Sequence, residues 1–149
     1  MIDSFEGHAP FKTNQAVSAI ERGRQAESAV AAYFVERGYA LIARNYSVPR
    51  LGELDLVMRP PLPVGAASAP GRSSLTVIEV KARSGPESRF GGAAAAITHA
   101  KLQRIRNATY HFQQTGHFMN NQIELLAALV HLDKNGLVQN IEIVPIEWQ

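Results

Sequence analysis

The segment from Leu75 to Lys81 ends in a charged triplet, Glu79-Val80-Lys81. Its first half, Leu75-Thr76-Val77-Ile78, is mostly apolar. Side chains alternate across a strand, so Glu79 and Lys81 would share one face while Ile78 and Val80 share the other. Opposite charges at the end of an apolar strand are costly to bury unless they are paired or have a function in a site. The triplet therefore indicates either a simple ion pair or part of a reactive site.

A similar pattern occurs one predicted strand earlier, in Glu53-Leu54-Asp55. Alternation places Glu53 and Asp55 on one face and Leu54 and Leu56 on the other. Two like charges on one strand face repel each other, and a cation would relieve that repulsion. The alternative is that the turn at Gly52 leaves Glu53 in water and only Asp55 is partly buried.

A third acid, Glu27, lies in a segment with helical periodicity. It follows Ile20 by seven residues and precedes Val30 by three and Phe34 by seven. This spacing places Glu27 on the apolar face of the helix. It is either a boundary residue, a buried partner for an arginine, or a member of a site.

Together, the three acids and Lys81 could converge on one face of a sheet. Oxygen ligands suit Mg²⁺ or Mn²⁺, which use few protein carboxylates and keep several waters. Such an ion stabilises negative charge on a phosphate and lowers the pKa of an attacking water. A nearby lysine can position that water or hold phosphate oxygens. The combination points to phosphodiester hydrolysis.

The elements that would position these residues follow from periodicity and from turn-forming residues. We predict one domain over residues 15–149, after a flexible tail over 1–14, with a proline-rich loop at 59–74. Asn14 would cap the first helix and Gly38 would end it, and Asp133-Lys134-Asn135-Gly136 is typical of a hairpin turn. The predicted helices are 15–37 and 93–114, and the predicted strands are 39–46, 53–58, 75–81, 124–132 and 137–144. The fold class is α/β in the order α-β-β-β-α-β-β, a central mixed sheet of about five strands flanked by helices.

Composition sets broader limits. The chain has 149 residues, 46% hydrophobic and 19% charged, which fits one globular domain. There is no cysteine, so disulfides, thiol catalysis and cysteine-ligated metals are excluded, in keeping with a cytoplasmic location. No apolar run is long enough to span a bilayer, and the N-terminus lacks a signal-peptide pattern. A net charge of +2 and a pI near 9.2 permit a nucleic-acid partner without requiring one.

The combined motifs resemble the YraN-like family of uncharacterised bacterial proteins over roughly Gly23 to the C-terminus. The matching stretches are Ala26-Glu27 with Ala29 and Tyr33, Gly38-Tyr39 through Arg44-Asn45-Tyr46, Gly52 to Leu56, Val77 to Arg83, and Lys101 with Arg104. Three features depart from the family pattern. The tail before Gln15 is extra. The proline-rich insertion separates Asp55 from Glu79 more than usual, and Gln122-Ile123-Glu124 stands where an Arg-Phe-Asp-like run usually opens a late strand.

The resemblance implies a restriction-endonuclease-like fold similar to that of archaeal Holliday junction resolvases. It implies that Asp55 and Glu79 bind the metal, that Lys81 is catalytic, and that Glu27 is an auxiliary catalytic and metal-binding residue. Glu53 would point toward solvent and support the ligands only indirectly. The expected function is a metal-dependent nuclease acting on DNA, with branched or damaged DNA as candidate substrates.

Basic residues outside this site are candidates for nucleic-acid contacts. Lys101 and Arg104, three residues apart, share a helical face, and Arg83 follows the predicted third strand. The alternative for a basic helix face is plain solvation. Two other readings of the whole chain remain open: a nucleic-acid-binding or scaffold module that does not cut, and a structural homo-oligomer, with a homodimer compatible with either function.

Overall fold

The computed structural model describes residues 18–65, 73–85 and 97–148. The elements are α1 (Ala19–Glu36), β1 (Ala40–Val48), β2 (Gly52–Arg59), β3 (Ser74–Ser84), α2 (His99–Thr115), β4 (Gln122–Leu132) and β5 (Val138–Ile146). The predicted α/β fold and its order α-β-β-β-α-β-β are confirmed. Among the described residues, no helix is long and apolar enough to cross a membrane.

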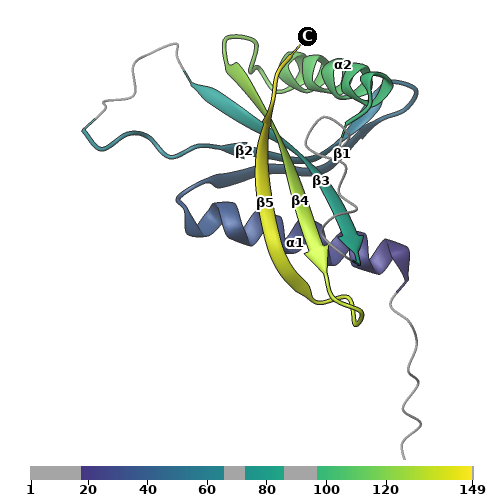
Figure 1. Ribbon diagram of the computed structural model, residues 1–149. Helices are drawn as coiled ribbons and strands as arrows, with labels where there is room; N and C mark the ends of the chain where they lie inside the picture. The colour runs from purple at the N-terminus through teal and green to yellow at the C-terminus, as the bar shows by residue number, and fades with distance from the viewer. Residues whose placement is uncertain (1–17, 66–72, 86–96, 149) are drawn as a thin grey trace, which may run out of the picture.

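A five-stranded mixed sheet in the order β1-β2-β3-β4-β5 forms the centre of the protein (Figure 1). The pairs β1–β2, β2–β3 and β4–β5 are antiparallel, and β3–β4 is parallel. A parallel pair requires a crossover, and α2 provides it between β3 and β4. The hairpin between β4 and β5 turns where it was predicted, with the Asp133 carboxylate accepting bonds from the backbone of Asn135 and Leu137.

Both helices begin later than predicted, because a hydroxyl residue caps each of them. Ser18 is extended and its side chain accepts a hydrogen bond from the Glu21 N–H at 3.1 Å, so α1 starts at Ala19. Thr98 does the same for Lys101 N–H at 3.1 Å, so α2 starts at His99. A side-chain oxygen in this position satisfies one of the unpaired N–H groups of the first turn. The predicted cap Asn14 and the predicted first turns at 15–17 and 93–96 lie outside the described residues.

Two hydrophobic cores lie on opposite faces of the sheet, one under each helix. The α1-side core joins Ala26, Val30 and Phe34 to Leu56, Met58, Ile78, Ala128 and Val130. The α2-side core joins Ile105, Ala108 and Phe112 to Leu54, Val57, Leu75, Val77 and Leu125. The central strands β2, β3 and β4 are buried on both sides, which explains their nearly continuous apolar sequences.

The long connection between β2 and β3 does not disturb the pairing of these strands. β2 ends at Arg59 and β3 begins at Ser74, and their ladder pairs Met58 with Thr76 and Leu56 with Ile78. Part of the predicted proline-rich loop, residues 66–72, lies outside the described residues, as does the predicted tail over 1–14.

Candidate metal and phosphate site

The two strands β2 and β3 stop pairing where their acidic residues begin. Their ladder ends at Leu56 with Ile78, so Asp55 and Glu79 would have been the next pair. Instead, the Asp55 carboxylate accepts a hydrogen bond from the Val80 N–H through Oδ2, at 2.8 Å. A side chain thus replaces the backbone carbonyl as the partner of this N–H. This exchange of hydrogen-bond acceptor places the Asp55 and Glu79 carboxyl groups side by side, within hydrogen-bonding range of each other.

A kink in β1 accompanies this change. Asn45 has a positive φ of 51°, an uncommon conformation that asparagine tolerates better than most residues. On either side of it, Arg44 pairs with Leu56 and Tyr46 pairs with Leu54. Leu56 belongs to the α1-side core and Leu54 to the α2-side core, so the prediction that these two leucines share a face is wrong.

Glu79 is the most perturbed residue of the site. It is only 3% exposed, and both Lys101 and Lys81 approach its Oε1 atom, with Nζ at 3.2 Å and 4.0 Å. Burial, and then the negative charge of Asp55, raise the pKa of Glu79 to about 7, against the opposing effect of Lys101. Desolvation and like charge both disfavour the ionised carboxylate. The site therefore carries stored electrostatic strain that a cation would release.

The two lysines differ in their relation to Glu79. Lys81 lies on the same face of β3 as Glu79, as predicted, and its side chain is 39% exposed. Lys101, which was expected to contact phosphate, reaches across from α2 and makes the shorter ion pair. Neither lysine is enclosed, since the Lys101 side chain is 35% exposed. A phosphate could therefore approach both amines from solvent.

Glu27 lies on α1 beside this centre rather than in it. Its Oε2 atom is buried and has no hydrogen-bond partner, and Arg44 Nη2 lies 3.8 Å from that atom. Burial raises the pKa of Glu27, the negative charge of Asp55 raises it further, and a hydrogen bond with Asn45 opposes both. Arg44 is itself held by the Ser28 hydroxyl at 2.8 Å. Glu27 therefore belongs to the same electrostatic cluster as Asp55.

The remaining predicted residues lie at the margin. Glu53 is exposed on β2, and Arg83 is exposed near the end of β3. Arg104 is exposed on α2, and its backbone carbonyl packs directly against Gly52, where an added Cβ would collide with it. Gly52 therefore allows α2 to sit close to β2, which brings Lys101 within reach of Glu79.

Three contributors were not identified as part of the site from the sequence. Asn45 forms the kink, Gly52 permits the approach of α2, and Lys101 neutralises Glu79. The available signals were an asparagine inside a predicted strand and a glycine directly before an acidic pair. Neither signal specifies a tertiary contact.

The residues present fit a divalent cation held by two carboxylates. Among residues 18–65, 73–85 and 97–148, no three His, Cys, Asp or Glu side chains are gathered as a ready-made metal site. Mg²⁺ typically uses one or two protein carboxylates and completes its shell with water and substrate oxygens. Asp55 and Glu79 provide such a pair, and Glu27, whose pKa responds to the charge of Asp55, is a further carboxylate in the same cluster.

Comparison with known proteins places the chain in a family. The model of the uncharacterised protein family UPF0102 matches residues 26–135. The chain belongs to the UPF0102 family. The resemblance found in the sequence is thereby confirmed, and the matched range contains Glu27, Asp55, Glu79, Lys81 and Lys101.

Relatives within UPF0102 share about two fifths of the aligned residues. A UPF0102 protein of Cupriavidus taiwanensis is 40% identical over 105 residues, covering 70% of each chain. One from Legionella pneumophila strain Corby is 41% identical over 92 residues, covering 62% of this chain and 66% of the relative. One from Methylococcus capsulatus is 42% identical over 90 residues, covering 60% and 62%. The names of these relatives state no activity.

Proposed function

We propose that this UPF0102 protein is a metal-dependent nuclease that hydrolyses phosphodiester bonds in DNA. The supporting observation is the pairing of Asp55 with Glu79 at the point where β2 leaves β3, with two partly exposed lysines beside them. Strongly perturbed pKa values in acidic groups with a nearby charge partner cluster at functional sites.

Asp55 and Glu79 would hold Mg²⁺ or Mn²⁺. The ion would supply positive charge for the scissile phosphate and a bound water of lowered pKa. The Val80 N–H fixes one oxygen of Asp55, so this carboxylate is already oriented before any ligand arrives. Preorientation reduces the cost of assembling the site.

Lys81 would act on the substrate. Its amine lies on the Glu79 side of the strand and is exposed enough to meet a phosphate oxygen or the attacking water. Lys101 would keep Glu79 paired before binding and become available to the phosphate once Glu79 has another cation. Glu27 would add negative charge near Asp55, and Arg104 and Arg83 would extend the contact along the phosphate backbone.

Cleavage assays test the proposal. Linear duplex, single-stranded, flap and four-way DNA, together with RNA, would be incubated with millimolar Mg²⁺ or Mn²⁺ and with EDTA as the blank. We expect metal-dependent cleavage of DNA that falls at least about 100-fold in Asp55→Asn and in Glu79→Gln. Lys81→Met should lose a similar factor, because a positioned acid–base group contributes about 100-fold or more.

The matched control is Glu124→Gln, which removes an exposed carboxylate from the neighbouring strand β4. Its cleavage rate should stay within about twofold of the unmodified protein, as is usual for surface substitutions. Cleavage that persists in both Asp55→Asn and Glu79→Gln would identify a contaminating nuclease and remove the proposal.

A second candidate function is a nucleic-acid-binding module that does not cut. The ion pair between Lys101 and Glu79 favours it, since Glu79 already has a cationic partner. Titration calorimetry with Mn²⁺ separates the two functions. Heat that disappears in Asp55→Asn supports the nuclease, whereas DNA binding without any metal heat supports the binding module.

A further inference from the structure

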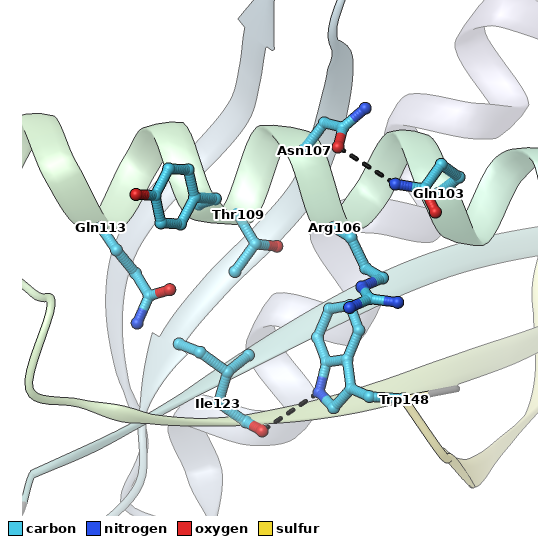
Figure 2. Close-up of a pocket in the computed structure, with 8 residues that line it drawn as sticks. Gln103, Arg106, Asn107, Thr109, Gln113, Ile123 and Trp148 are labelled. Carbon is cyan, nitrogen blue, oxygen red and sulfur yellow. Dashed lines mark hydrogen bonds between the residues drawn. The ribbon is translucent and has the colours of Figure 1, made fainter.

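A cavity of about 450 Å³ lies along α2, on a part of the helix that the candidate metal site does not use (Figure 2). The side chains of Gln103, Asn107 and Tyr110 line it at spacings of four and three residues, so they form one stripe of the helix. Ile123 at the start of β4 and Trp148 near the C-terminus close the other side. This volume lies within the range of small-molecule sites, about 300–1,000 Å³.

One wall of the cavity is a fixed aromatic ring. The indole Nε1 of Trp148 donates a hydrogen bond to the Ile123 carbonyl at 3.2 Å, which holds the ring in place against β4. Tyr110, on α2, also lines the cavity and is 54% exposed. Exposed aromatic groups beside a cavity offer stacking surfaces for a planar ligand.

The polar groups of the cavity are mainly amides rather than acids. The Gln103 amide donates to the Asn107 side-chain oxygen at 3.2 Å, and Gln113 donates to the backbone carbonyls of Phe118 and Asn121, each at 3.2 Å. Among the described residues that line the cavity, none carries a carboxylate and one, Arg106, is basic. Arg106 extends toward Trp148 in Figure 2. Amides beside a single cation suit a ligand with both donors and acceptors and a negative charge.

Thr109 gives an independent sign of a missing partner. Thr109 lines the cavity and is 4% exposed. Its hydroxyl oxygen is buried and has no hydrogen-bond partner. A buried hydroxyl without a partner costs free energy comparable to a lost hydrogen bond. A ligand atom that accepts or donates a hydrogen bond at this point would satisfy it.

We propose that this cavity binds a nucleobase, stacked on the aromatic wall and hydrogen-bonded by Thr109 and the amides, with its phosphate toward Arg106. Base stacking on aromatic side chains combined with amide contacts to base edges is the common way to bind unpaired bases. The inference rests on the proposed function only in taking a nucleic acid as the natural source of the base. A base held there would make an unpaired nucleotide part of the preferred substrate.

Fluorescence provides a direct test, because Trp148 is the single tryptophan of the chain. The full-length protein would be titrated in EDTA with each nucleoside monophosphate, with a short single-stranded oligonucleotide, and with an abasic oligonucleotide of equal length. We expect a saturable change in Trp148 emission with the base-bearing ligands and none with the abasic strand. Tighter binding of the oligonucleotide than of the monophosphates would identify a nucleic-acid strand as the source, and equal binding would identify free nucleotides.

Two matched variants locate the effect. Thr109→Val should weaken binding about tenfold, since it removes the buried hydroxyl beside the cavity at nearly constant shape. Thr115→Val removes a hydroxyl from the same helix that is already bonded to the His111 carbonyl at 2.9 Å, and it should leave the affinity unchanged. Asn107→Ala, at an exposed position, provides a second lining variant that does not threaten folding.

The proposal is overturned if the abasic strand changes the emission as much as the base-bearing one, or if no ligand gives a saturable change. Equal weakening by Thr109→Val and Thr115→Val would also overturn it. The titrations contain no divalent ion, so they can succeed while cleavage fails. Conversely, cleavage that is lost in Asp55→Asn but normal in Thr109→Val, with no fluorescence response, would keep the nuclease and reject the base site.

Discussion

The two ends of the β2–β3 pair differ in their backbone pairing and in the charge that they bury. At one end, Leu56, Val57 and Met58 pair regularly with β3 and are fully buried in the two cores. At the other end, the ladder stops, Asp55 takes over a backbone hydrogen bond, and Glu79 is buried with a raised pKa. The same two strands thus contain a segment optimised for stability and a segment that works against it.

Under the proposed function, the acidic segment gives up folding stability in return for a metal site. Apolar side chains at the positions of Asp55 and Glu79 would continue the ladder and the core without electrostatic cost. Acidic groups that repel each other there are explained if a cation joins them during function. Substitutions in the two segments should therefore have opposite effects on folding stability.

The largest expected effect is in the regular segment. Leu56→Ala removes a side chain that is 0% exposed in the α1-side core, and the free energy of unfolding should fall by about 2–5 kcal/mol. Chemical denaturation followed by circular dichroism measures this loss. A loss of unfolding free energy below about 1 kcal/mol would mean that the regularly paired segment is not the part that stabilises the fold.

In the acidic segment, Glu79→Gln should stabilise the protein at alkaline pH. The pKa of Glu79 is about 7 in the folded protein against 4.5 for the unperturbed group, so the folded state binds more protons between these values. The stability of the unmodified protein therefore falls as pH rises from about 4.5 to 7. Without metal, the variant should be more stable by the order of 3 kcal/mol at pH 8 and nearly unchanged at pH 4.

Denaturation curves at several pH values in EDTA measure this difference. A Glu79→Gln variant that is destabilised at pH 8 would show that the carboxylate is satisfied as it stands. Glu124→Gln serves again as the exposed control and should show no comparable pH dependence.

Gly52→Ala tests the contact that positions the two segments relative to α2. An added Cβ would meet the Arg104 carbonyl, which belongs to helix backbone and cannot rotate away. We expect a loss of about 1–3 kcal/mol, the usual cost of overpacking. In NMR spectra, we expect changes in the chemical shifts of residues along α2 as far as Lys101. Gly23→Ala, where an added Cβ meets nothing within 4 Å, should leave these chemical shifts unchanged.

The smallest expected effect comes from Lys101→Met. Loss of the amine leaves Glu79 with the more distant Lys81, and its pKa should rise further because one stabilising cation is gone. The Lys101 side chain is partly exposed, so the cost should be about 1 kcal/mol at pH 8 and close to zero at pH 5. An equal cost at both pH values would show that Lys101 acts through packing rather than charge.

Sequence reasoning identified the elements and the acidic pair because both depend on local periodicity. Alternation along β3 was enough to place Glu79 and Lys81 on one face, and an apolar stripe was enough to orient Glu27. The helix starts were wrong, since Ser18 and Thr98 compete as caps with residues several positions earlier. Alternation also failed in β2, where Leu54 lies in the α2-side core and Leu56 in the α1-side core.

The role of Lys101 could not be predicted for a different reason. Its ion pair depends on how closely α2 packs against β2, and that distance is set by Gly52 against the Arg104 carbonyl. Contacts between segments far apart in sequence follow from the assembled fold and not from the spacing of residues. The same holds for the buried hydroxyl of Thr109, because the hydrogen-bond partners of a side chain depend on the assembled fold.

The proposed function depends on a divalent-cation site formed by Asp55 and Glu79. Crystals soaked in Mn²⁺ test it most directly, because anomalous scattering locates the ion without assumptions about activity. We expect an anomalous peak bound by both carboxylates, with Lys101 displaced from Glu79, and no peak there in Asp55→Asn crystals. Mn²⁺ density elsewhere on the protein, with the Lys101–Glu79 ion pair still intact, would contradict the claim.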